Sequence, residues 1–269
     1  MKKTIAIILA LVMIVGCLVG CGSKKDEKTI KVGASPTPHA VILGAVKDVL
    51  AEQGYTLEIV EYNDYVLPNT AVEDGSLDAN FFQHKPYLDD FNANNGTHIV
   101  SAAAIHYEPF GIYSNSITSI DELTDGATIA IPNDGSNEAR ALFLLEQEGL
   151  ITLKEGTSVA AATILDIESN PRNFNIVEME AAQLVLALPD VAIAVINGNY
   201  AIGGGLKVED ALAVEDASGD AAITYANIIA VKEGNENSEK TTALINALTS
   251  DKVVAFIEET FGASVLPIF

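Results

Sequence analysis

The sequence predicts an α/β fold of two lobes, and three features support this prediction. From Thr29 onward, short apolar runs alternate with amphipathic helical stretches, which is typical of βα units around a largely parallel sheet. The series is interrupted at residues 108–114, where Pro109 and Gly111 indicate a crossing from one lobe to the other. The length of 269 residues allows two compact lobes or one large domain, and the interruption favours two lobes.

The first series is expected to hold four strands and three helices. Thr37 can cap the first helix, with Pro38 at its first helical position. Each strand is an apolar run between polar or turn-forming residues, and each helix stops at a glycine; we expect strands at 30–32, 57–60, 79–82 and 99–106, and helices at 38–53, 67–74 and 85–94.

The second series has shorter elements. It is expected to contain strands at 128–131, 175–178 and 191–196, a helix at 137–148, a flexible turn at 203–205, a strand at 223–231, and two final helices at 238–249 and 251–261.

The strand at 223–231 can return the chain to the first lobe, where the two final helices would pack. The first lobe is therefore predicted to comprise residues 29–112 and 226–269. The second lobe is predicted to comprise residues 113–225.

The N-terminus has the layout of a secretory leader. Two lysines precede an unbroken apolar run, residues 5–15, and small residues then lead to a cysteine. The four residues that end at Cys21 resemble a bacterial lipobox, in which the cysteine becomes the lipidated first residue of the mature chain. We expect residues 1–20 to be the signal peptide, and residues 21–28 to be the lipidated cysteine and a polar tether.

Two alternatives to this leader remain open. Residues 14–17 fit the lipobox pattern as well, so Cys17 offers a second cleavage register, although cleavage there would leave an apolar stub before the polar run. An uncleaved membrane anchor or an ordinary signal peptide would replace lipidation. Each alternative places the rest of the chain at the extracytoplasmic face of the cell membrane.

The charge of the chain excludes several partners. Removing the two lysines of the leader from the 15 basic residues leaves 13 against 37 acidic ones, a formal charge of −24. Nucleic acid and anionic lipid headgroups are poor partners for such a chain, so membrane attachment is expected through two or three acyl chains, palmitate among them. No cysteine follows Cys21, which excludes disulfides and thiol chemistry from the mature chain.

Aromatic side chains gather where two successive strands are predicted to end. Tyr65, Phe82, His84 and Tyr87 fall at these ends, where open α/β sheets place their ligands. Rings clustered there would form an apolar slot with hydroxyl and imidazole groups at its edge. Ordinary core packing explains the same residues, and the sequence leaves both interpretations open.

The predicted helix start after residue 131 carries one of only two arginines in the chain. Asp134 or Ser136 can cap this helix, and Arg140 lies near its first turn. A guanidinium group there suits a ligand carboxylate, because its planar fork grips both carboxylate oxygens. A salt bridge to Glu138 or Asp134 is the alternative. On sequence alone, Arg140→Ala is expected to fold normally and to lose any ligand at least tenfold.

Two asparagines complete the candidate polar groups. Asn197 ends an apolar strand and Asn227 lies inside another, so each buried amide needs a partner. An amide carbonyl can accept from a ligand ammonium group. Turn formation explains Asn197 equally well, and a backbone contact explains Asn227.

The sequence gives little support to an enzyme. It has no Gly-x-Ser-x-Gly elbow, phosphate-binding loop or His-Glu-x-x-His motif. The four histidines, at positions 39, 84, 98 and 106, show no metal-ligand spacing. We therefore expect no catalytic residues, no metal and no cofactor.

Four runs of the chain carry a specific resemblance. Residues 63–69, 82–87, 132–140 and 194–197 closely resemble the methionine-binding lipoproteins of bacterial ABC importers, the NlpA family. The segment QHKPY, residues 83–87, is a specific marker when NDYVLPN precedes it at this distance. The order and spacing of these runs match those of the family, and the resemblance extends from about residue 31 nearly to the C-terminus.

The resemblance implies a fold, a function and a set of site residues. The fold is the two-lobed periplasmic-binding-protein fold of type 2, which closes over methionine in the cleft between the lobes and delivers it to a permease with a cytoplasmic ATPase. By matched position, Arg140 would hold the ligand carboxylate with help from Asn137, and Asn197 and Asn227 would receive the ammonium. The ligand side chain would be enclosed by Tyr65, Phe82, His84 and Tyr87.

Two departures from the family pattern leave the ligand choice open. Gly135 and Ser136 stand where relatives usually have Pro and Thr, and Gly198 and Asn199 stand where they have Thr and Thr. D-methionine, a methionine-containing dipeptide or another small apolar amino acid are alternatives to L-methionine. A surface adhesin or sensor that kept the fold and lost transport is a further one.

Overall fold

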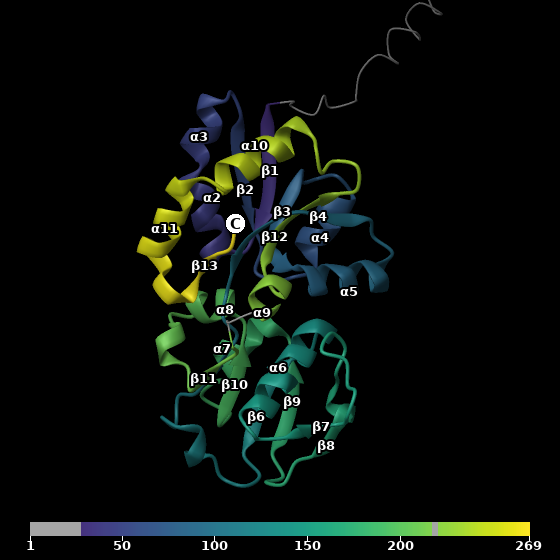
Figure 1. Ribbon diagram of the computed structural model, residues 1–269, viewed down its shortest axis with the longest axis vertical. Helices are drawn as coiled ribbons and strands as arrows, with labels where there is room; N and C mark the ends of the chain where they lie inside the picture. The colour runs from purple at the N-terminus through teal and green to yellow at the C-terminus, as the bar shows by residue number, and fades with distance from the viewer. Residues whose placement is uncertain (1–27, 217–219) are drawn as a thin grey trace, which may run out of the picture.

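The computed structural model describes residues 28–216 and 220–269. The expected signal peptide, the lipidation site at Cys21 and the tether before Lys28 lie outside the described residues. Figure 1 shows two α/β lobes, one above the other. Within the described ranges, no helix is both long and apolar enough to cross a membrane.

The first lobe is built on a six-stranded sheet in the order β13-β4-β12-β3-β1-β2. Strand β1 pairs in parallel with β2 and β3, whereas β12 pairs antiparallel with both β3 and β4. The sheet is thus mixed, and the expectation of a largely parallel sheet holds only for the consecutive strands. Strand β12 arrives from the other lobe and not through a helical crossover, so nothing forces it to run parallel. The strands are β1 Thr29–Ala34, β2 Thr56–Glu61, β3 Ala79–His84, β4 Ile99–Tyr107, β12 Asn227–Lys232 and β13 Leu266–Pro267.

Helices cover the faces of this sheet and bury its apolar side chains. Ile30, Val32 and Phe81 pack with Leu244 and Ile257 in one core cluster, which joins the first strands to the two C-terminal helices. The predicted helix from Pro38 is divided into a π-helical turn and two α-helices. The helical elements are the turn Pro36–Ala40, α2 Val41–Ala45, α3 Lys47–Glu52, α4 Leu67–Glu73, α5 Lys85–Asn95, α10 Glu239–Leu248 and α11 Asp251–Phe261.

The second lobe holds a five-stranded sheet in the order β11-β5-β10-β6-β9. Its core contains Ile129, Leu142 and Val195, which come from two strands and the long helix α6. The elements are β5 Gly111–Tyr113, β6 Thr128–Pro132, α6 Gly135–Gln147, β7 Thr152–Leu153, β8 Ile167–Ser169, β9 Asn175–Met179, α7 Leu184–Ala187, β10 Ile193–Ile196, α8 Gly198–Gly203, β11 Ala213–Val214 and α9 Asp220–Thr224.

The chain passes between the two sheets where the sequence places a crossing. Strand β4 ends at Tyr107 in one sheet, and β5 begins at Gly111 in the other. The return path differs from the predicted strand at 223–231, because α9 occupies its start and β12 begins only at Asn227. The segment just before Asn227 is a short apolar run, and a run of this length is compatible with either a helix or a strand.

Candidate functional site

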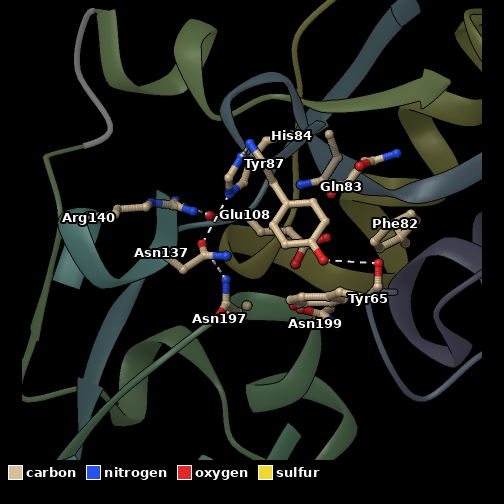
Figure 2. A pocket seen from close by; sticks show the side chains of 12 residues that line it. Tyr65, Phe82, Gln83, His84, Tyr87, Glu108, Asn137, Arg140, Asn197 and Asn199 are labelled. Carbon is tan, nitrogen blue, oxygen red and sulfur yellow. Dashed lines mark hydrogen bonds between the residues drawn. The ribbon is translucent and has the colours of Figure 1, made fainter. Parts of the chain in front are cut away.

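A pocket lies between the lobes, and all eight residues predicted to bind a ligand line it. Strand β3 and the residues after β4 contribute from the first lobe; the starts of α6 and α8 contribute from the second (Figure 2). The lining residues are Tyr65, Phe82, Gln83, His84, Tyr87, Glu108, Asn137, Arg140, Asn197, Gly198, Asn199 and Asn227. The free volume is about 20 Å³, enough for about one water molecule.

One side of the pocket is an aromatic slot. The ring of Tyr65 lies 5.5 Å from those of both Phe82 and Tyr87, between centroids, and Phe82 and Tyr87 are 6.0 Å apart. The Tyr87 hydroxyl donates to the Tyr65 carbonyl at 3.0 Å. Figure 2 shows these rings on the side of the pocket away from Arg140. The slot can enclose an apolar side chain.

His84 links the aromatic slot to the polar side. It caps α5, and its Nδ1 accepts from the Tyr87 backbone N–H at 3.2 Å. The proton of the neutral ring therefore lies on Nε2, which donates to Asn137 Oδ1 at 3.1 Å. Burial, and then the positive charge of Arg140, lower the pKa of His84 to about 3. His84 is thus a neutral donor and not a charged ligand partner.

Asn137 orients the side chain of Asn197 through the Asn197 amide nitrogen, and the Asn197 amide oxygen is left without a partner among the described residues. Asn137 Oδ1 accepts from Asn197 Nδ2 at 2.9 Å. Asn137 is held in turn by Asp134, the residue that caps α6, which accepts from its backbone and side-chain nitrogens. Asn197 Oδ1 is buried and has no hydrogen-bond partner among the described residues. An unpaired buried acceptor is costly, and this one lies in the pocket wall.

Arg140 is paired with a carboxylate that the sequence analysis did not identify. Its Nε donates to Glu215 Oε2 at 2.8 Å, and its Nη2 donates to Glu215 Oε1 and, at 3.2 Å, to the Glu108 carbonyl. Glu215 also accepts from the Phe110 backbone N–H at 3.1 Å and from the Tyr107 hydroxyl. Glu215 lies 75 positions along the chain from Arg140, so no local pattern indicates the pairing.

The alternative prediction, that Arg140 forms a salt bridge, is therefore correct, but the predicted partners, Glu138 and Asp134, are wrong because the partner is Glu215. Glu138 faces away and accepts from the Ile164 backbone N–H at 2.9 Å, and Asp134 caps the helix. Within the described part of the chain, the hydrogen bonds of Arg140 come from Nε and Nη2, and none comes from Nη1. The guanidinium carbon lies 4.3 Å from the Tyr225 ring centre.

Glu108 is the second functional side chain that the sequence analysis missed. It is 5% exposed and lines the pocket, and burial raises the pKa of its carboxyl. Its contact with the second lobe requires a glycine, because a Cβ atom at Gly198 would lie 2.6 Å from Glu108 Cβ. The chain has 37 acidic residues, so the sequence did not distinguish Glu108, in the segment that connects the lobes, from the other acidic residues.

Direct contacts hold the lobes together at the pocket. The Tyr65 hydroxyl donates to Asn199 Oδ1 at 2.6 Å, and the Tyr200 hydroxyl donates to the Asn63 carbonyl at 3.1 Å. The rings of Tyr65 and Tyr200 lie 5.0 Å apart. The lobes are therefore closed on each other in this structure.

The two α/β lobes enclose a small pocket. One side of this pocket carries buried ion-pairing and amide groups, and the other side carries aromatic rings. This arrangement defines a bilobal substrate-binding protein. The chain belongs to the NlpA lipoprotein family, which it matches over residues 30–269. The predicted family and fold class are both confirmed.

Individual relatives agree with this assignment. The chain is 41% identical to the methionine-binding lipoprotein MetQ of Bacillus subtilis, over 100% of this chain and 99% of that one. It is 40% identical to the D-methionine-binding lipoprotein MetQ of Escherichia coli, over 97% and 96%.

Solved structures resemble most of the chain as well. A putative lipoprotein of Ruminococcus gnavus is 54% identical with a TM-score of 0.88, covering 90% of this chain and 100% of that one. A nutrient-binding protein of Burkholderia cenocepacia, solved bound to methionine, is 42% identical with a TM-score of 0.85, covering 89% and 100%.

Proposed function

We propose that this protein captures methionine at the extracytoplasmic face of the cell membrane and delivers it to an ABC permease with a cytoplasmic ATPase. The observation that carries the proposal is the unpaired, buried Asn197 Oδ1, which shares one pocket with Arg140 and the aromatic slot. The pocket thus offers separate partners for an ammonium, a carboxylate and an apolar side chain. The methionine-bound relative at 42% identity supports the same ligand class.

The ammonium of the ligand is expected to meet oxygen acceptors on both lobes. Asn197 Oδ1 comes from the end of β10, and Asn227 and Glu108 come from the first lobe. A carboxylate with a raised pKa and two amide oxygens suit a positive group that carries three donors. Since these acceptors come from both lobes, an ammonium between them would favour the closed arrangement.

The carboxylate of the ligand is expected to bind Arg140 through Nη1, with Asn137 at the same helix start. Because Glu215 already holds Nε and Nη2, the ligand would add to an existing ion pair and would not meet an isolated cation. This single contact differs from the bidentate pairing with the ligand carboxylate that an arginine alone suggested.

Ligand entry requires the lobes to separate. A free volume of about 20 Å³ holds about one water molecule, whereas methionine has nine non-hydrogen atoms. We propose that the two lobes open about the crossing segments, residues 108–110 and 225–226, and close on the ligand. The lipid anchor at Cys21 would keep this cycle at the membrane, and the pocket would bind without catalysis.

The proposal is tested by calorimetric titration of the chain lacking residues 1–21, after unfolding and refolding to remove carried-over ligand. L-methionine, D-methionine, leucine and a methionine dipeptide are titrated in turn. Tight binding of L- or D-methionine is the expected result. Refolded protein that binds neither enantiomer of methionine would overturn the proposal, whether or not it binds leucine or the dipeptide.

The aromatic slot is expected to tolerate loss of the ligand sulfur. A sulfur against an aromatic ring contributes about 0.3 to 1.5 kcal/mol, so norleucine should bind within roughly tenfold of methionine. Glutamate and lysine should not bind measurably, because the rings that form the slot offer no counter-charge. Competition calorimetry checks both statements, and a hundredfold loss with norleucine would contradict the slot assignment.

Tyr65→Phe is expected to weaken methionine binding by about twofold to tenfold. The variant keeps the ring and loses only the 2.6 Å hydrogen bond to Asn199 across the lobes, worth about 0.5 to 1.5 kcal/mol. The loss should lie in the dissociation rate, measured by stopped-flow displacement. Tyr200→Phe is the matched control, since its hydroxyl bonds Asn63 at the exposed rim, and it should change the rate less.

A further inference from the structure

Two buried histidines of the first lobe contact acceptors of the pocket, and the roles given above leave these two rings unused. His39, from the turn after β1, and His106, from β4, are both 0% exposed. His106 Nε2 lies 2.7 Å from Glu108 Oε1, and His39 Nε2 lies 3.3 Å from the same oxygen. His39 Nε2 also lies 2.9 Å from Asn227 Oδ1. The two rings thus contact two of the pocket-lining acceptors.

The contacts fix where the ring protons lie. Glu108 and the Asn227 carbonyl oxygen are acceptors, so the ring nitrogen that faces them carries the hydrogen. The opposite nitrogen, Nδ1, of each of His39 and His106 is buried without a partner among the described residues. A second proton would therefore have no acceptor, and burial lowers the pKa of His39 to about 4 and that of His106 to about 3. Both rings are neutral donors.

We propose that His39 and His106 are positioning residues for the ammonium subsite, where their Nε2–H groups hold Glu108 and Asn227 in the orientation that receives the ligand ammonium. This inference rests on the proposed function. Neither ring lines the pocket, so both act through the two acceptors. Glu108 Oε1 accepts from His106 Nε2–H, and Asn227 Oδ1 accepts from His39 Nε2–H. The other carboxylate oxygen, Glu108 Oε2, lies on the side of Gly198, and the Asn199 backbone N–H also donates to this carboxylate.

Hydrogen bonding explains the cluster better than a metal ion does. One nitrogen of each histidine and one oxygen of Glu108 lie within 4.8 Å of one another, a spacing that a small cation could bridge. However, 2.7 Å between His106 Nε2 and Glu108 Oε1 is a hydrogen-bond length, whereas two ligands of one tetrahedral zinc lie about 3.3 Å apart given bond lengths of about 2 Å. The unpartnered Nδ1 atoms also lack the supporting bonds that metal-ligating histidines usually make.

The test compares two ligands that differ only in the ammonium group. L-methionine and its desamino analogue, 4-(methylthio)butanoate, are titrated into the full-length chain in detergent, with ligand-observed NMR for the weaker one. His106→Leu and His39→Leu should each weaken methionine at least tenfold and change the affinity of the analogue less than twofold. His106→Gln, which keeps a donor near the Nε2 position, should recover most of the loss. His98→Leu, at an exposed histidine of the same lobe, should change neither ligand.

Each other outcome has a definite meaning. Equal losses for both ligands, or unchanged methionine affinity in both leucine variants, would overturn the inference. Affinity that EDTA removes and Zn²⁺ restores would replace it with a metal site. Failure of the unaltered chain to bind methionine would instead overturn the proposed function, so the two failures are distinguishable. Circular dichroism and urea midpoints establish that each variant is folded.

Discussion

Arg140→Ala is expected to abolish measurable methionine binding and also to lower the free energy of unfolding by about 3 to 5 kcal/mol. The binding loss follows from removing Nη1, the donor left for the ligand carboxylate. The stability loss follows because Glu215 would remain as a buried carboxylate without its counter-charge. The second effect revises the expectation, drawn from sequence alone, that this variant folds normally.

A second variant separates the two effects. Arg140→Met combined with Glu215→Gln removes both charges but keeps an acceptor for the Phe110 backbone N–H. Replacing a buried ion pair by neutral groups of similar size is often neutral for stability, so the double variant should recover most of the loss. It should still not bind.

Urea unfolding and calorimetry on the single and double variants check this prediction. Methionine binding by the double variant within tenfold of the unaltered chain would contradict the carboxylate role of Arg140. An Arg140→Ala variant as stable as the unaltered chain would contradict the cost assigned to an unpaired Glu215.

The sequence was sufficient for the elements whose apolar period is strong. Strand β3 and helix α6 fall within two residues of their predicted bounds, because an apolar run or a capped amphipathic stretch is a local signal. The return strand was predicted too long, since Ile223 and Thr224, which fit a strand, form the end of helix α9, and a short apolar run does not distinguish helix from strand. The antiparallel direction of β12 depends on the path of the chain between lobes, which no local pattern encodes.

The site residues likewise fall into those that the sequence predicted and those that it did not. Tyr65, Phe82 and Tyr87 were found because they stand at predicted strand ends and helix starts. Glu215 and Glu108 were missed because their partners are set by tertiary packing, up to 108 positions away for the bond from Tyr107 to Glu215. Spacing along the chain gave no metal-ligand pattern for the four histidines and no sign that His39 and His106 meet, yet the fold brings these two rings together, with ring centres 5.0 Å apart.

Between pH 7 and pH 5, the free energy of unfolding is expected to fall by about 3 to 6 kcal/mol. His39, His84 and His106 are buried and neutral in the folded protein, with pKa values lowered by burial to about 4, about 3 and about 3. In the unfolded chain they take up protons as the pH falls below about 6.5, so the unfolded state binds more protons than the folded one. Their contribution to stability is therefore complete above pH 6.5 and is lost progressively as the pH falls toward 4 and 3.

Buried carboxyls oppose part of this loss. Burial raises the pKa of Glu108 and Asp134, so the folded state binds protons at these groups before the unfolded state does. Their stabilising effect grows as the pH falls through the raised pKa values toward the unfolded values near 4. Three histidines contribute up to about 1.4 kcal/mol each per pH unit, so the histidine effect should dominate from pH 7 to pH 5.

Histidine variants test the origin of the slope. His84→Gln keeps a neutral donor near Asn137 and should reduce the stability difference between pH 7 and pH 5 by about 2 kcal/mol, the share of one buried histidine. His98→Gln, at a side chain that is 66% exposed, should leave the difference unchanged. Urea unfolding at the two pH values measures all three chains. An equal slope in all of them would mean that the buried rings are protonated in the folded state, and the neutral donor network around Asn137 and Glu108 would then be wrong.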